Sequence, residues 1–263
     1  VLVKSIADLL LSSQEKANAR QLYKLYVDKL VAGKMTDLEL KDIAAGFYKE
    51  ENLDLAQTVY DIYIEKVSKS LATDKFIQEL FEIASMFVYK PAGLFDMAYA
   101  EKIYAKIEEL GQSKAFNQEQ IYLRAFNLEK AKEYKKAKEV YLQLIQLYAE
   151  SKHLDEATYK IAMIDAYVLA DILEAKSYFE KLTVKLPVTA HVISSFYQLG
   201  LLWQWEGDLV KAKGYYDTLI KNSSDLQSSI VVSAKDRIKE IEENKPLDYN
   251  LKTFLDLSFK EGS

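Results

Sequence analysis

The sequence predicts an all-α protein, a right-handed α-solenoid of about six helical pairs followed by a capping helix and a tail. Glycine contributes 8 and proline 3 of the 263 residues, well below the roughly 7% and 5% of average proteins. Apolar residues recur at positions i, i+3, i+4 and i+7 almost throughout, and strand-like alternation is not sustained anywhere. Because sheet folds need more turn residues than this chain has, we expect helices joined by short turns.

Short polar breaks divide the chain into segments of about 12 to 18 residues, a typical length for globular helices. Several breaks carry side chains suited to capping a helix N-terminus, namely Thr36 or Asp37, Thr73 or Asp74, Asp171 and Asp208. No linker is long enough to divide the superhelix expected over residues 1–244. We expect six helical pairs, at residues 1–32, 36–70, 73–112, 116–150, 153–187 and 189–223. A capping helix is expected at residues 226–244. The tail, residues 245–263, could form a short amphipathic helix.

A small residue followed by an aromatic ring recurs along the chain. An alanine stands four residues before a tyrosine or phenylalanine at Ala19/Tyr23, Ala56/Tyr60, Ala100/Tyr104, Ala137/Tyr141, Ala175/Phe179 and Ala212/Tyr216. The spacings between these alanines are 37, 44, 37, 38 and 37 residues. A fixed period of this length indicates a repeat architecture, in which the alanine lets two helices approach and the ring fills the space beside it.

The last predicted pair shows the fullest motif. Its first helix, its turn and its second helix carry Phe196, Leu199, Gly200, Trp203, Gly207-Asp208, Ala212 and Tyr216. These residues resemble the tetratricopeptide signature W-x2-L-G-x2-Y … A-x3-F … P. The fifth pair matches less fully, through Tyr159, Ala162, Ala166, Ala175, Phe179 and Pro187. The resemblance implies six tetratricopeptide-like pairs up to about residue 223, with longer turns or helices than the usual repeat of about 34 residues.

The C-terminal third resembles the bacterial envelope members of this family more closely. The pattern is A-x3-Y/F-x-K/T-L, a short polar or proline-containing turn, a helix with Y-x-L-G, and a Gly-Asp turn. It is similar to the Tol–Pal coordinator and to the tetratricopeptide lipoprotein of outer-membrane β-barrel assembly. This resemblance implies a periplasmic or outer-membrane-associated protein, with the cytoplasm as the alternative. The chain begins at Val1 rather than Met, which indicates that an upstream segment is absent; a cleaved leader, a lipidated stretch and simple trimming are the alternatives.

Several function classes lack their sequence signals. The net charge is −5 with no basic block, which argues against nucleic-acid binding. The chain has no cysteine and no apolar run of about 18 residues, which excludes thiolate chemistry and a membrane-spanning segment. No nucleotide-binding, hydrolase or metalloprotease motif is present. His153 is expected to be solvated, and His191 to face solvent or to cap the start of a helix. We therefore expect a protein without catalytic residues, metal or cofactor; a carboxylate-only active site is the remaining enzymatic alternative.

A second set of aromatic residues lies on another face of the first helix of each pair. In the tetratricopeptide family that face lines the groove, so the resemblance implies partner-binding residues at Tyr89, Tyr122, Phe126, Tyr167, Tyr197, Leu201 and Trp205. Amphipathic rings of this kind suit the capture of an extended or helical peptide. The alternative is that this stripe is core between neighbouring pairs. Only Lys41 and Lys160 fall on lining positions, which argues against a basic carboxylate clamp.

The predicted function is a non-enzymatic interaction scaffold or adaptor that binds a protein or peptide in this groove. The alternative is a transport accessory that encloses a small molecule or a lipid in a closed apolar groove. The tail places five apolar residues at a helical period, at Leu247, Leu251, Phe254, Leu255 and Leu257. It could fold back and cap the end of the solenoid, or dock into a partner's groove.

Overall fold

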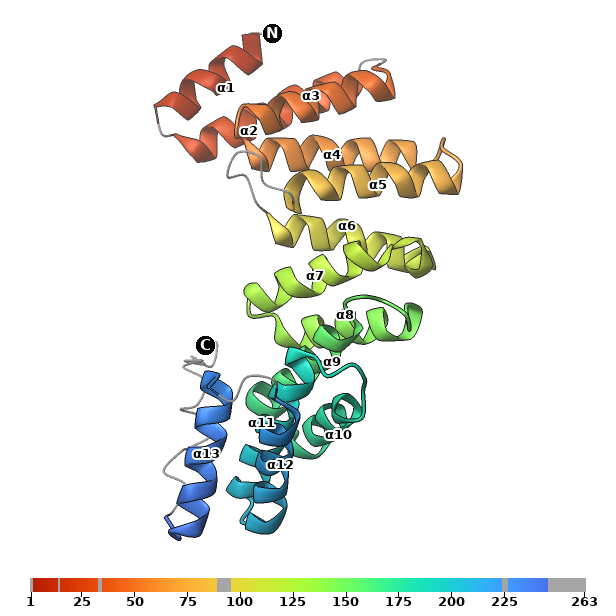
Figure 1. The fold of residues 1–263 in the computed structure, drawn as a ribbon. Helices are drawn as coiled ribbons and strands as arrows, with labels where there is room; N and C mark the ends of the chain where they lie inside the picture. The colour runs from red at the N-terminus through yellow and green to blue at the C-terminus, as the bar shows by residue number, and fades with distance from the viewer. Residues whose placement is uncertain (1, 14, 33–34, 89–95, 224–226, 246–263) are drawn as a thin grey trace. The chain divides into compact units, whose positions relative to one another are not determined.

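The computed structural model describes residues 2–13, 15–32, 35–88, 96–223 and 227–245. Within these ranges the chain forms thirteen α-helices, one 3₁₀ turn and one π-helical turn, with no β-strand (Figure 1). The prediction of an all-α protein with helices packed in adjacent pairs is confirmed. The chain divides into two compact units, Val1–Ala115 and Phe116–Ser263.

The first unit consists of three helical pairs. Within each pair the two helices pack side by side. Further contacts join α4 to α2 and to α5. The pairs are α1 (Leu2–Ser12) with α2 (Lys16–Ala32), α3 (Asp37–Lys49) with α4 (Leu53–Val67), and α5 (Thr73–Val88) with α6 (Met97–Glu109), before a 3₁₀ turn at Ser113–Ala115.

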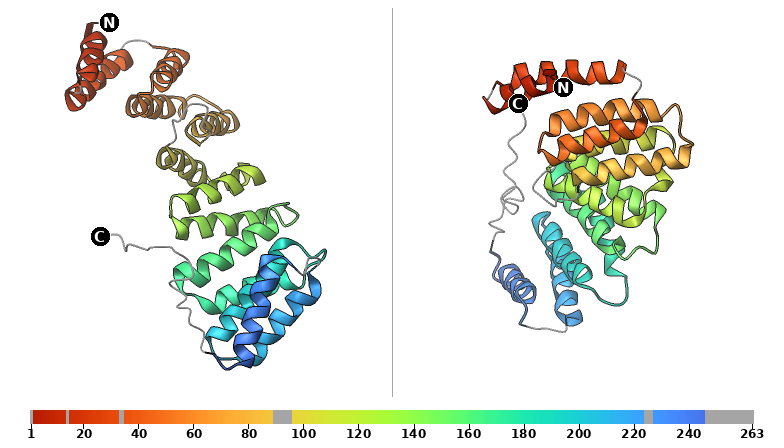
Figure 2. Two further views of the ribbon diagram at one scale, coloured as in Figure 1. Left: turned by 60° about the vertical axis from the view of Figure 1, so that its left-hand side comes forward. Right: turned by 90° about the horizontal axis from the view of Figure 1, so that it is seen from above.

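The second unit contains three more pairs and a final single helix, which packs against α12 (Figure 2). Successive pairs also contact each other, through α8 with α9 and through α10 with α11. The elements are α7 (Gln118–Lys130), α8 (Tyr134–Leu147), α9 (Leu154–Ile164), the π-helical turn η2 (Asp165–Leu169), α10 (Ile172–Thr183), α11 (Ala190–Trp205), α12 (Leu209–Asn222) and α13 (Ser229–Glu242).

Helix starts follow the polar breaks of the sequence. Thr36 accepts a hydrogen bond from the backbone N–H of Glu39, whose carboxylate accepts one from the backbone N–H of Thr36, and the two form a capping box. Asp171 and Asp208 likewise accept from the N–H three residues ahead. These three predicted caps are confirmed. Thr73 is instead the first helical residue of α5, so it does not cap that helix from outside.

The alanine and ring positions form the core of each pair. All six alanines and all six rings of the repeated motif are buried. The closest approach is at Gly200 on α11, where a Cβ atom would lie 2.7 Å from Cδ1 and Cζ of Tyr216 on α12. Only glycine permits this spacing, because carbon atoms in ordinary contact stay 3.4 Å or more apart. The repeated motif is therefore the packing contact that joins the two helices of a pair.

Candidate functional site

A hollow of about 380 Å³ opens between the end of α7, the start of α8 and the α9–η2 segment. It lies within the second unit and combines apolar walls with charged groups. We call it the α7–α9 hollow. Its lining residues are Glu129, Lys130, Lys132, Tyr134, Tyr159, Lys160, Met163, Ile164 and Val168.

The charges at the base of the hollow are paired. Glu129 accepts a hydrogen bond from the ammonium of Lys160 (2.7 Å) and another from the hydroxyl of Tyr141 (2.9 Å). Burial, reinforced by the negative charge of Glu129, raises the pKa of Tyr141, so this phenol stays protonated and keeps donating. The base is therefore a closed network of hydrogen bonds that joins α7, α8 and α9 and carries little net charge.

The wall along α9 and η2 is apolar. Tyr159 packs edge-on against Phe179 of the next helix, with ring centroids 5.6 Å apart, and Ile164 is buried. Met163 and Val168 keep part of their surface exposed. Met163 lies just before the π-helical turn and Val168 within it, and both line the hollow. They are the apolar groups of this wall that a ligand can reach.

Two lysines at the rim give the hollow its positive charge. The ammonium of Lys130 lies 5.2 Å from the ring centroid of Phe126, one turn earlier on α7. Lys132 is exposed at the turn after α7 and has no ion pair among the described residues. An apolar wall beneath a cationic rim suits a ligand that combines apolar and acidic groups.

Tyr122 and Phe126, two of the predicted partner-binding residues, lie along α7 next to this rim. The two rings stack with centroids 6.3 Å apart. The Tyr122 ring also stacks on His153, with centroids 4.0 Å apart and planes inclined by 8°. The expectation that His153 is solvated is therefore wrong: the imidazole is covered by this ring, and its Nε2 lies 3.0 Å from the carboxylate of Glu119.

The other predicted residues lie elsewhere. The hydroxyl of Tyr167 donates to Gln198 of α11, and the Tyr197 ring lies 5.8 Å from that of Tyr216. Leu201 is only 4% exposed, whereas Trp205, at the end of α11, is 48% exposed. Tyr89 lies outside the described residues. The structure thus brings together Tyr122 and Phe126, and partner contact by any of the seven stays a prediction.

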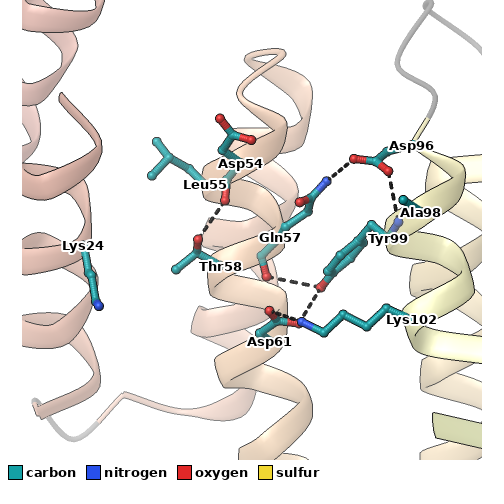
Figure 3. Close-up of a pocket in the computed structure, with 10 residues that line it drawn as sticks. All are labelled: Lys24, Asp54, Leu55, Gln57, Thr58, Asp61, Asp96, Ala98, Tyr99 and Lys102. Atoms are coloured by element: carbon teal, nitrogen blue, oxygen red, sulfur yellow. Dashed lines mark hydrogen bonds and ion pairs between the residues drawn. The ribbon is translucent and has the colours of Figure 1, made fainter. Parts of the chain in front are cut away.

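A larger hollow, of about 550 Å³, lies in the first unit beside α4 and α6, with Lys24 of α2 also lining it (Figure 3). Its polar groups bind each other across the two helices. Gln57 donates to Asp96 (2.6 Å), while Tyr99 and Lys102 donate to Asp61 (3.1 and 2.6 Å). Because these groups are already partnered, we interpret this hollow as a polar contact between pairs.

The same contact recurs along the chain. Gln57 follows the alanine of the repeated motif, and lysines occupy that position in the last three pairs. Each of them binds an acidic residue of the following pair or helix, in the contacts Lys138–Glu174 (2.9 Å), Lys176–Glu206 (2.6 Å) and Lys213–Glu242 (2.6 Å). We call these contacts the inter-pair clamps. Sequence reasoning missed them, although the Ala-Lys dipeptide at a constant position was a visible signal.

The second unit also holds a buried carboxylate. Asp165, the first residue of η2, is fully buried and accepts a hydrogen bond from Lys138 (2.6 Å). Burial raises the pKa of Asp165 although Lys138 opposes the shift. The described residues contain no group of three or more histidine, aspartate or glutamate side chains placed to hold a metal ion. None of the described helices combines the length and the apolar character needed to span a bilayer.

Stacked helical pairs joined by alanine–ring contacts define an α-helical repeat protein. Within the chain, residues 121–151 match the sequence profile described as Tetratricopeptide repeat. The matched segment runs from the first turn of α7 through α8 and includes Tyr122, Phe126 and Glu129. The predicted resemblance to tetratricopeptide repeats is therefore supported directly for this segment.

Two solved structures are similar to this chain. YrrB, "a TPR protein with an unusual peptide-binding site", shares 19% identity with a TM-score of 0.45, over 81% of this chain and 97% of that one. The C-terminal part of a TPR repeat-containing protein from Cytophaga hutchinsonii shares 19% identity with a TM-score of 0.44, over 88% and 98%. Sequence comparison with curated proteins finds no significant match.

Proposed function

We propose that this chain is a tetratricopeptide-type scaffold that holds a segment of a partner protein in the α7–α9 hollow and along the neighbouring rings of α7. The observation that carries the proposal is an open apolar wall beneath two rim lysines, next to a segment that matches the repeat. The role proposed is binding without catalysis. Stacked helical repeats form extended concave surfaces that bind partner proteins.

The lining of the hollow indicates the chemistry of the partner segment. Met163 and Val168 would take an apolar anchor side chain, and the rings of Tyr122 and Phe126 extend this apolar surface along α7. Lys130 and the unpaired Lys132 would face acidic residues beside that anchor, since opposite charges across an interface favour association. We therefore propose a segment in which leucine-type residues alternate with aspartate or glutamate.

Binding of two synthetic peptides tests this proposal. Both are labelled with fluorescein and share the same leucine positions, but one carries aspartate and glutamate between them and the other carries lysine. Fluorescence anisotropy at low salt should show saturable binding of the acidic peptide only, weakening as salt screens the rim. The proposed partner class is wrong if the acidic peptide does not bind or if both peptides bind equally.

Substitutions locate the binding on the structure. Lys132→Glu reverses a charge at an exposed turn, so the fold should tolerate it, and Met163→Asp places a charge on the apolar wall. Each substitution should weaken binding of the acidic peptide at least about tenfold, which corresponds to about 1.4 kcal/mol of binding free energy. The matched controls, Lys239→Glu and Val232→Asp on α13, should leave the affinity unchanged. Equal affinity of the Lys132→Glu variant and the parent would place the site elsewhere.

We further propose that the chain works in the bacterial envelope. The support is the likeness of its C-terminal third to envelope tetratricopeptide proteins, which is a sequence argument only. Fractionation of the source organism with an antibody against the protein tests it. Recovery with the periplasmic or outer-membrane fraction is the expected result, and recovery with the cytosol would overturn this part of the proposal without touching the binding site.

A further inference from the structure

The second unit exposes a group of apolar side chains where its last helices begin or end. Leu173 stands in the first turn of α10, Trp205 ends α11, and Leu209 and Val210 begin α12. Leu173 and Val210 are 81% and 85% exposed. Large exposed apolar groups gathered in one place usually mark a surface that something else covers. We call these four residues the apolar edge.

The first turns of α10 and α12 lie next to each other. The ring of Trp203 on α11 is sandwiched between two ammonium groups: Lys176 of α10 lies 3.6 Å and Lys211 of α12 lies 3.9 Å from its centroid. Lys176 also pairs with Glu206, the residue after Trp205, at 2.6 Å. Leu173 stands three residues before Lys176 and Val210 one residue before Lys211, so these two exposed side chains lie on neighbouring first turns, and Trp205 ends the helix that packs against both.

The edge is also hollowed. Beside α10 lies a depression of about 470 Å³ that Leu173, Ser177 and Trp203 help to line. Of its charged members, Lys176 and Glu174 are engaged in the inter-pair clamps with Glu206 and Lys138, whereas Asp171 caps α10 and Glu180 accepts a hydrogen bond from Tyr215. The depression therefore offers Leu173 as its exposed apolar side chain.

The chain leaves the described structure close to this edge. Lys213, in the first turns of α12, pairs with Glu242 at the end of α13, with 2.6 Å between Nζ and Oε1. The described chain continues only to Lys245. The described chain therefore ends near the beginning of α12, where Leu209 and Val210 are exposed.

The sequence of this segment matches the edge in length and character. Leu247, Leu251, Phe254 and Leu255 recur at i, i+4, i+7 and i+8, which is the pattern of one apolar helix face. Eighteen residues span about 27 Å as a helix. Neighbouring packed helices lie about 8–10 Å apart, so such a span covers the starts of both α10 and α12.

We propose that residues 246–263 dock on the apolar edge of their own chain and cover Leu173, Trp205, Leu209 and Val210 with their leucine and phenylalanine side chains. The tail thus serves as an internal ligand for this edge. Trp205, which the sequence assigns to partner binding, belongs in this arrangement to an intramolecular contact.

The absence of cysteine from the chain permits a direct test by engineered disulfides. One variant carries Ser177→Cys in the depression and Ser258→Cys in the tail. The matched control carries Ser229→Cys, at the start of α13, with the same Ser258→Cys. The 13 residues from Lys245 to Ser258 reach up to about 43 Å, so a free tail would meet both positions. The rate of intramolecular disulfide formation is measured in dilute protein by mass spectrometry.

The disulfide with position 177 should form at least about tenfold faster than that with position 229, because docking raises the effective concentration of the tail there. A third variant adds Leu251→Ser, Phe254→Ser and Leu255→Ser, which should abolish this preference while circular dichroism stays unchanged. Equal rates at the two positions, or a preference that survives the three serines, would overturn the proposal. Disulfides between two protein molecules only would assign the edge to a second copy and would also overturn it.

Discussion

Replacing Gly200 by alanine should destabilise the second unit, although alanine is the better helix former. The added Cβ atom would lie 2.7 Å from Cδ1 and Cζ of Tyr216, about 0.7 Å closer than ordinary contact allows. The ring cannot withdraw freely, because Tyr216 is fully buried and its hydroxyl donates to Gln204 at 2.9 Å. The ring of Tyr197 lies beside it, at 5.8 Å between centroids.

The magnitude follows from three terms. Overpacking a rigid core costs about 1–3 kcal/mol. Displacing Tyr216 weakens a buried hydrogen bond that contributes about 1 kcal/mol. The higher helix propensity of alanine over glycine stabilises the folded state by about 1 kcal/mol and offsets part of this loss. The net loss for Gly200→Ala is therefore about 2 kcal/mol, with the sign set by the clash.

Gly214→Ala on α12 is the matched control. Nothing lies within 4 Å of the Cβ position there, so only the helical preference acts and the variant should gain about 1 kcal/mol. Both tryptophans of the chain are on α11, so urea unfolding followed by tryptophan fluorescence reports on this unit. A Gly200→Ala variant as stable as the parent would refute the reasoning, because it would show that the ring adapts without cost.

Two further substitutions test the buried charges of the second unit. Lys176→Met removes the clamp to Glu206 from a largely buried site and should lower the free energy of unfolding in urea by about 1–2 kcal/mol. The control Lys239→Met, in an exposed pair, should change it by less than about 0.5 kcal/mol. Equal effects of the two substitutions would argue against a structural role of the clamp. Burial holds the pKa of Asp165 above its ordinary value of 3.8 despite Lys138. The folded protein therefore keeps a proton that the unfolded chain has released, and stability should decline as the pH rises from 3.8 through the raised value. Asp165→Asn should remove this decline in the urea midpoints, and an unchanged pH profile would exclude Asp165 as its source.

The fold could be predicted because its determinants are local and repeated. An alanine and a ring four residues apart occupy one helix face, and their recurrence shows that the same contact is made again in each pair. Thr36, Asp171 and Asp208 cap their helices for reasons contained in a few residues. The π-helical turn at Asp165–Leu169 has no comparable signal, because one extra residue in a helix leaves the apolar pattern almost unchanged.

The candidate site could be predicted only in part, because it depends on which helices meet. Tyr122 and Phe126 were found from their spacing, but the hollow beside them also needs Met163 and Val168, which line it from α9 and from the π-helical turn. Leu201 shares the spacing of Tyr197 and Trp205 yet is buried, since α11 is covered on several sides. His153 stacks on a ring 31 residues earlier in the chain, a contact that no local pattern reveals.

The inter-pair clamps have a consequence for how a protein of this kind can change in length. Each clamp spans only 29 to 36 residues, so its two partners belong to neighbouring pairs or, for the last clamp, to the last pair and α13. In the second unit the lysine of one helical pair, or module, forms an ion pair with a glutamate of the following module. A glutamate of the same module binds the lysine of the preceding module. A gene duplication of about one period would therefore supply both halves of the new junction at once. Such a chain can grow or shrink by whole modules while every remaining junction keeps its charge balance.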